Sequence, residues 1–136
     1  MIIIIIKMKN KTNKKQMPDL TGFTGTTQYH KLTMGDLKFT DGWAYLAQEI
    51  GCFWLADIVG SVQHLPKIKE YKQFILWKIE LKDKQAIVSA YWDTEEDGSF
   101  SDDKKLYTQT IEYTDFPETN FEWYQEGDVV LLKNEH

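Results

Sequence analysis

Residues 71–92 read YKQFILWKIELKDKQAIVSAYW, and this stretch decides the fold. Apolar and polar side chains alternate along both of its halves, which is typical of β-strands with one buried face. Asp83 and Lys84 lie between the halves and suit a tight turn. The stretch therefore predicts a hairpin of strands 71–81 and 85–92. Five residues alternate along the first strand: Tyr71, Ile75, Trp77, Ile79 and Leu81. In the second strand, Ala86, Val88, Ala90 and Trp92 would share one face.

Upstream of the hairpin the apolar residues recur with a helical period. Trp43, Leu46, Ala47 and Ile50 predict a first helix with Thr40 as its N-cap and Gly51 at its end. A second helix is predicted from about residue 52 to residue 65, with a stripe of Leu55, Ile58, Val59 and Val62. Pro66 would close it. Before the first helix, residues 27–32 form a short extended candidate.

Downstream of the hairpin, residues 106–113 predict a further strand. Residues 121–125 and 129–133 predict a last hairpin around Gly127. The predicted class is α+β, with two consecutive helices packed on a four-stranded antiparallel β-meander. Residues 17–136 would form a single domain, because 136 residues fit one core. Residues 1–16 would be a basic tail, and the isoleucine run 2–6 could add an N-terminal strand.

Charge is divided sharply along the chain. Residues 1–16 carry five lysines and no acid, whereas residues 17–136 carry eleven lysines and all 21 Asp and Glu, a net charge of −10. Residues 93–128 alone hold twelve acids against Lys104 and Lys105, and the chain contains no arginine. A body with this field repels nucleic acid and attracts basic protein surfaces. Nucleic acid would be touched only weakly, if at all, through the lysine tail.

Catalytic patterns in the sequence are weak. Asp57, Ser61 and His64 share one helix face, but that face lies opposite the apolar stripe, so they predict a solvated surface. Cys52 is the one cysteine, which excludes an internal disulfide and favours a reducing cytosol. The three histidines lack zinc-ligand spacing, and no phosphate-binding motif is present. We therefore expect no catalytic residues, no metal and no cofactor.

The acidic half also contains aromatic side chains. Aromatic rings framed by acids are suitable anchors for a basic protein partner. Base-stacking proteins instead combine such rings with basic grooves, which this half lacks. The predicted partner-binding residues are Tyr91, Trp92, Asp93, Glu95, Glu96, Asp97, Asp102 and Asp103.

Three strings add a family resemblance: TDGWAYLA at residues 40–47, WLAD at residues 54–57 and YTDFP at residues 113–117. Together with the entry FTGTTQYHK they resemble an uncharacterised family of small proteins carried by phages, plasmids and other mobile elements of bacteria. The resemblance covers about residues 20–132. It implies a mobile-element accessory protein in the cytosol of a bacterial host, and it carries over no catalytic residue.

Charge, size and resemblance together predict a non-enzymatic, acidic inhibitor of a host defence effector. The partner would be a basic nucleic-acid-handling protein, such as an RNA-guided nuclease, so the protein would act as an anti-CRISPR. Two alternatives stay open at this point. One is a structural or regulatory module that self-associates, as a homodimer through residues 2–6. The other is a small metal-dependent hydrolase that uses the acidic loop.

Overall fold

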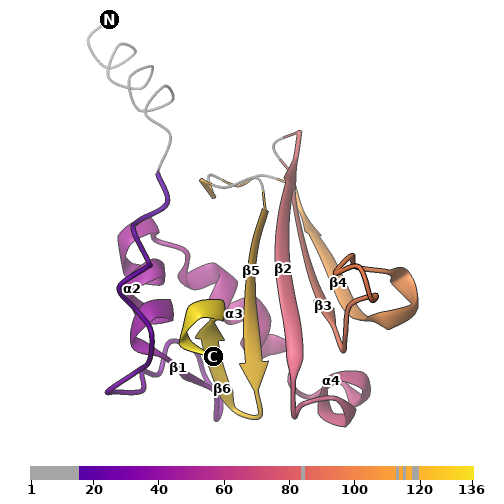
Figure 1. Cartoon of the computed structure of the whole chain (residues 1–136), viewed down its shortest axis with the longest axis horizontal. Helices are drawn as coiled ribbons and strands as arrows, with labels where there is room; N and C mark the ends of the chain where they lie inside the picture. Colours follow the sequence, from indigo (N-terminus) through magenta and orange to yellow (C-terminus); the bar gives the residue numbers. More distant parts are fainter. Residues whose placement is uncertain (1–15, 84, 113, 115, 118–119) are drawn as a thin grey trace, which may run out of the picture.

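The hairpin of residues 71–92 lies inside a larger sheet in the computed structural model of the chain (Figure 1). The structure describes residues 16–83, 85–112, 114, 116–117 and 120–136. Strands β2 (Ile75–Lys82) and β3 (Gln85–Tyr91) pair antiparallel, as predicted. Asp83 adopts a positive φ of 52° at the turn between them. Trp92 lies just past β3 and is exposed, so the second predicted strand is one residue too long.

Six strands form one sheet in the order β1-β6-β5-β2-β3-β4. The four further strands are β1 (Lys38–Phe39), β4 (Lys105–Ile111), β5 (Asn120–Glu126) and β6 (Val129–Leu132). The α+β class is confirmed, but the sheet is not a four-stranded antiparallel meander. β1 runs parallel to β6, and β5 pairs with β2 instead of with β4.

The insertion of β5 beside β2 has a physical reason. Ile75, Trp77 and Ile79 of β2 are all 0% exposed. In a meander β2 would form an edge of the sheet, where large side chains are harder to cover. With β3 on one side and β5 on the other, the most apolar strand occupies the interior.

Three α-helices lie in the described part of the chain: α2 (Asp41–Ile50), α3 (Phe53–Ser61) and α4 (Pro66–Glu70). α2 matches its predicted bounds and ends at Gly51, which has a left-handed φ of 68°. The second predicted helix is too long. In the structure α3 ends at Ser61. Pro66 does not close this helix but begins α4, because the first turn of a helix does not need the N–H that proline lacks.

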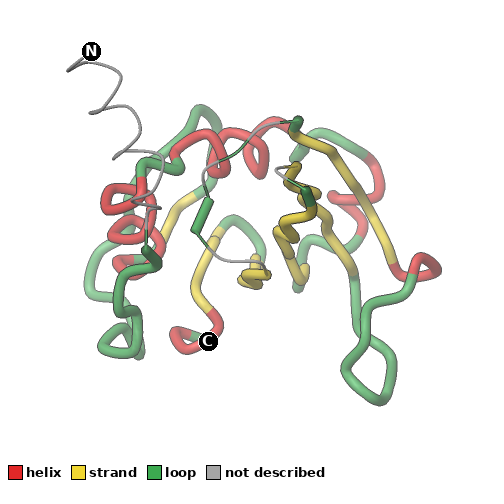
Figure 2. Tube along the Cα trace, turned by 90° about the horizontal axis from the view of Figure 1, so that it is seen from above, coloured by secondary structure: helices red, strands yellow, loops and turns green. Residues whose placement is uncertain are grey.

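A cluster of tryptophans joins the helices to the sheet. The ring of Trp43 in α2 meets the ring of Trp123 in β5 edge-on at 5.8 Å, and Trp123 stacks on Trp77 at 6.0 Å. All three are 0% exposed. Figures 1 and 2 show α2 and α3 on one side of the sheet and the C-terminal turn η2 (Lys133–Glu135) on the other.

One buried polar side chain is fully bonded beside this cluster. Gln125 is 0% exposed, and its Oε1 accepts hydrogen bonds from Trp77 Nε1 at 3.0 Å and Gln63 Nε2 at 3.1 Å. Its Nε2 donates to Gln63 Oε1 at 2.8 Å and to the Gly127 carbonyl at 2.9 Å. A buried amide whose donors and acceptor all have partners costs little and fixes the register of the strands around it.

The start of α2 is held by the C-terminal end of the chain. Thr40 occupies the N-cap position, but its hydroxyl does not cap the helix, contrary to the prediction. It donates instead to Glu135 Oε1 at 2.5 Å, and the Gly42 N–H donates to Glu135 Oε2 at 3.0 Å. The Glu135 carboxylate thereby accepts a free helix N–H at the positive end of the helix dipole.

The predicted strand at residues 2–6 lies outside the described residues and stays a prediction. Residues 27–32 are not a strand: within them only His30 forms a β-bridge, to Phe39. Among the described residues, no helix has the length and apolar character needed to cross a membrane.

We expect Gly42→Ala to lower the free energy of unfolding by about 1–3 kcal/mol. An added Cβ would lie 2.6 Å from Leu132 Cδ1 and 2.8 Å from Glu135 Oε1, so the carboxylate that holds the helix must move. The measurement is denaturant unfolding. Gly22→Ala is the matched control, because its Cβ would meet nothing within 4 Å. Equal stability of the two variants would contradict the crowding at Gly42.

Candidate functional site

The loop of residues 93–103 joins β3 to β4 and is shaped by its own hydrogen bonds. The Glu95 N–H donates to the Ser99 carbonyl at 2.8 Å, and the Gly98 N–H donates to the Glu95 carbonyl at 2.9 Å. Gly98 has a φ of 84°, a left-handed conformation that glycine adopts readily, and it lets the chain turn after Asp97. The Ser99 hydroxyl and N–H both donate to Asp97 Oδ1, and they lower the pKa of Asp97.

Two lysines brace this acidic loop from inside. Lys104 Nζ donates to the Thr94 carbonyl at 2.9 Å and lies 3.7 Å from Glu95 Oε1. Lys105 Nζ lies 3.0 Å from Asp102 Oδ1, and the hydrogen bond from Lys105 to this carboxylate raises the pKa of Lys105. Part of the negative charge of the loop is therefore already compensated.

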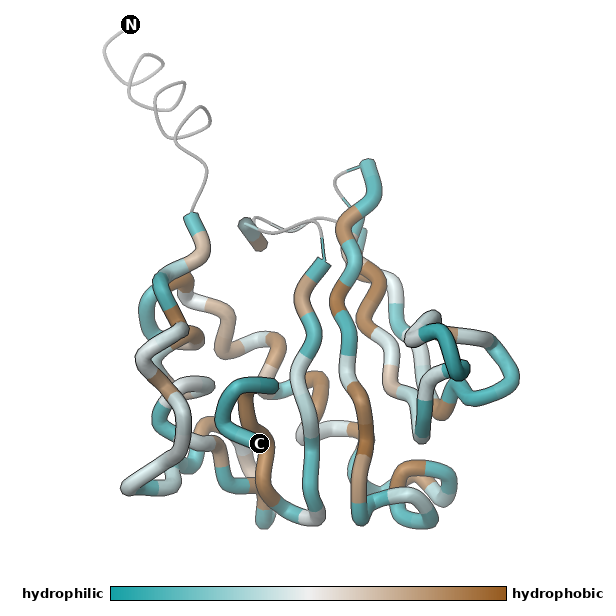
Figure 3. Tube along the Cα trace, in the orientation of Figure 1, coloured by the Kyte–Doolittle hydropathy of each residue, from teal (hydrophilic) through white to brown (hydrophobic). Residues whose placement is uncertain are grey.

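The remaining carboxylates face solvent. Asp93, Glu96, Asp97, Asp102 and Asp103 are exposed, and the side chain of Asp102 is 93% exposed even though it is paired. Glu96 and Asp103 form no hydrogen bond or ion pair with any residue that the structure describes. In Figure 3 hydrophilic residues predominate along the loop beside β4. The loop thus presents uncompensated negative charge on an ordered backbone.

The two predicted aromatic anchors have different environments. Trp92 is 37% exposed and stacks on Tyr71 at 5.6 Å, with Lys104 Nζ 5.3 Å from its ring. Tyr91 is only 4% exposed and packs against Phe100 at 4.7 Å. Trp92 is therefore accessible to a partner, whereas Tyr91 is buried and supports the loop by packing against Phe100. The sequence did not single out Phe100, and its position inside an acidic loop was the one available signal.

A second polar cluster lies at the start of α2 and was not predicted. His30 Nε2 is 2.7 Å from Asp41 Oδ1, and the Thr27 N–H and hydroxyl donate to Asp41 Oδ2 at 2.9 and 3.0 Å. The Asp41 N–H donates to Thr26 Oγ1 at 2.9 Å. The bond from the Thr27 N–H, followed by that from His30, holds the pKa of Asp41 far below its usual range. Neither the types of these residues nor their spacing in the sequence predicts that they form a cluster.

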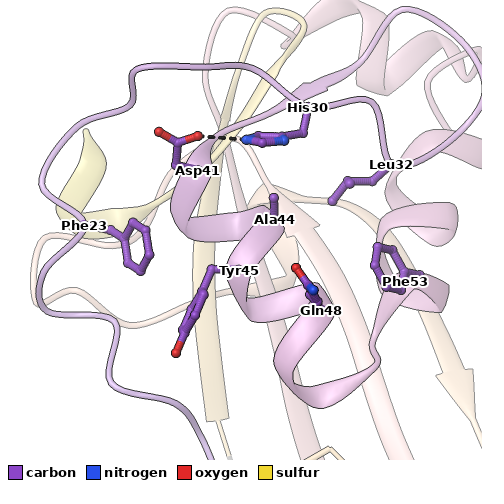
Figure 4. Close-up of a pocket in the computed structure, with 8 residues that line it drawn as sticks. All are labelled: Phe23, His30, Leu32, Asp41, Ala44, Tyr45, Gln48 and Phe53. Atoms are coloured by element: carbon purple, nitrogen blue, oxygen red, sulfur yellow. Dashed lines mark hydrogen bonds and ion pairs between the residues drawn. The ribbon is translucent and has the colours of Figure 1, made fainter.

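This cluster borders a shallow hollow of about 320 Å³ (Figure 4). The lining residues are Phe23, His30, Leu32, Asp41, Ala44, Tyr45, Gln48 and Phe53. None of them offers a serine, threonine or cysteine nucleophile, and both oxygens of Asp41 are already bonded. The pair of His30 and Asp41 therefore ties residues 26–30 to α2.

The remaining residues considered in the sequence analysis lie neither in the acidic loop nor in the cluster around Asp41. Asp57, Ser61 and His64 are exposed, and the Ser61 hydroxyl donates to the Ile58 carbonyl of its own helix at 2.9 Å. Cys52 is 1% exposed. Within the described residues, no group of three or more His, Cys, Asp or Glu side chains is placed to hold a metal ion.

A family model described as "Family of unknown function (DUF6876)" matches residues 14–136. The chain belongs to this family. Membership agrees with the expected uncharacterised family, whereas the mobile-element origin stays a prediction. No curated protein and no solved structure matches the chain.

We expect Asp41→Asn to lower the melting temperature near neutral pH, because the amide cannot replace the ionised carboxylate. The folded pKa of Asp41 lies below its unfolded value of about 3.9. The contribution of the ionised form is therefore complete above that value and declines as the pH falls toward the folded pKa.

Thermal unfolding across this pH range should show the gap between wild type and Asp41→Asn narrowing in acid. Asp36→Asn is the control, since Asp36 is exposed and has no hydrogen bond within the described structure. A gap of constant size from neutral pH down to about pH 3 would contradict the assigned role of Asp41.

Proposed function

We propose that the protein is a non-enzymatic inhibitor whose acidic loop, residues 93–103, docks on a basic surface of a target protein. The exposed Trp92 directly precedes an ordered loop whose carboxylates are mostly exposed, and this observation carries the proposal. Tryptophan is enriched at the energetic centres of protein interfaces, and the rims of such interfaces are polar.

The electrostatics favour a protein partner over nucleic acid. The net charge of −10 on residues 17–136 repels phosphates and raises the rate of encounter with basic surfaces. Surfaces that bind DNA or RNA are themselves basic, so an acidic loop can compete for them. The target class that fits is a nucleic-acid-handling host defence effector, and an RNA-guided nuclease is the most concrete candidate.

The internal hydrogen bonds of the loop support this function. Lys104 and the paired residues Glu95 and Ser101 fix the backbone before any partner arrives. A preorganised loop loses less conformational entropy on binding than a disordered one does. The mobile-element context, taken from the resemblance of residues 40–47, 54–57 and 113–117, supports an anti-defence role in the bacterial cytoplasm.

The structure suggests which acids to change in a test. Glu95 and Asp97 hold the loop together, so their loss would mix folding with binding. Glu96 and Asp103 are exposed and have no ion pair within the described structure. The pair between Asp102 and Lys105 lies at the surface, where ion pairs contribute little stability. We expect Glu96→Lys, Asp102→Lys and Asp103→Lys together to weaken target binding roughly ten-fold or more while the melting temperature stays close to that of the wild type.

The first assay is affinity capture of a target from RNase-treated host lysate. The captured protein is then titrated with the inhibitor to measure the Kd, and its nuclease activity is measured with and without the inhibitor. The matched control reverses three other exposed acids, Asp36, Glu49 and Asp57, with the same change in net charge. Selective loss of binding and of inhibition with the loop variant is the expected result. Equal binding by both triple variants, or a bound target whose activity is unaffected, would refute the proposal.

A further inference from the structure

The two edges of the sheet are protected very differently. The β1 edge is two residues long, and Phe39 is bridged on that side by His30. The β4 edge is seven residues long, and no described residue pairs with its outer side. Such an edge exposes a row of backbone N–H and C=O groups, which proteins usually shield with prolines, charges or bulges.

Shielding of β4 is confined to its first residues. The pairing with β3 is regular for Tyr107–Ile111 and shifts before Tyr107, where Leu106 is skipped. The positive charge of Lys105 also lies at this end, and α4, which contacts β4, sits at the lower end of the sheet (Figure 1). Residues 107–111 contain no charge and no proline. Five residues of open edge therefore remain.

These five residues read YTQTI, and their chemistry is symmetric about Gln109. Thr108 and Thr110 are exposed, whereas Tyr107 and Ile111 pack against the core but stay half exposed. In an antiparallel pair of identical strands centred on Gln109, Tyr107 of one copy lies opposite Ile111 of the other. Thr108 then lies opposite Thr110. Aromatic with β-branched, and Thr with Thr, are favourable cross-strand pairs.

We propose that β4 pairs with β4 of a second copy of this chain, antiparallel and with the two-fold axis at Gln109. The pairing joins two six-stranded sheets, satisfies the open backbone groups and covers the exposed parts of Tyr107 and Ile111. At the ends, Glu112 of one copy comes near Lys105 of the other, so the charges are complementary. This inference does not depend on the proposed inhibitor function, because it leaves the loop of residues 93–103 outside the paired strands.

The register predicts a specific cross-link. Gln109 faces itself across the axis with Cα atoms about 4.5–5.5 Å apart, which a disulfide can span. Thr108 faces Thr110, and its own counterpart lies roughly 8 Å away, which is too far. Under mild oxidation Gln109→Cys should therefore form a covalent dimer. Thr108→Cys and the wild type should not, since Cys52 is 1% exposed.

Light scattering of the full chain gives the second measurement, with a dimer of twice 16.0 kDa expected. Gln109→Glu places two carboxylates across the axis and should raise the dimer Kd roughly two- to five-fold. The matched control Thr110→Glu faces a neutral Thr108 and should change the Kd less. A monomer at high concentration would overturn the inference. A dimer that cross-links through Thr108→Cys and not through Gln109→Cys would also overturn it. So would a dimer whose Kd is unchanged by Gln109→Glu.

Discussion

The whole architecture depends on the carboxylates gathered at the first turn of α2. Glu135 accepts hydrogen bonds from Thr40 and Gly42, and Asp41 accepts hydrogen bonds from Thr27 and His30. Helix N-termini expose unpaired N–H groups and a positive dipole end, so two carboxylates there are favourable. Three segments far apart in the sequence thereby meet at one turn. The orientation of α2 that results places Trp43 against Trp123, and the tryptophan cluster follows from it.

The same arrangement explains why the acidic loop can serve another purpose. The buried apolar residues come mainly from α2, α3 and the inner faces of the strands. No residue of the loop between Asp93 and Asp103 belongs to that core. Contacts at the junction and in the core stabilise the fold, whereas the exposed carboxylates of the loop add net negative charge and repel one another. The proposed docking on a basic partner gives this charge a role that the fold does not require.

Local features of the fold could be predicted from the sequence, and its long-range pairings could not. Alternation identified the hairpin of β2 and β3, and the helical stripe with Gly51 gave the bounds of α2. Periodicity tells which face of a strand is buried but not which strand lies beside it, so the pairing of β5 with β2 was missed. Pro66 was misread because proline both follows helices and begins them.

The two polar places on the surface show the same limit. The acidic loop is contiguous in sequence, so its charge could be predicted from the sequence. The cluster of His30 and Asp41 joins residues eleven positions apart across a bend, and no spacing rule connects them. Thr40 was expected to cap its own helix, yet its hydroxyl donates a hydrogen bond to Glu135, which lies 95 residues later in the chain. Contacts of that range depend on the completed fold.

Native-state amide hydrogen exchange tests most directly whether the junction at the first turn of α2 stabilises the fold while the loop of residues 93–103 does not. The Gly42 amide, which donates to Glu135, should exchange only with global unfolding, together with the amides of β2. The amides of Glu95, Gly98 and Ser99 should open locally at a far lower free energy, even though they are hydrogen-bonded within the loop. A Gly42 amide that exchanges as readily as these loop amides, or loop amides as protected as β2, would contradict the account.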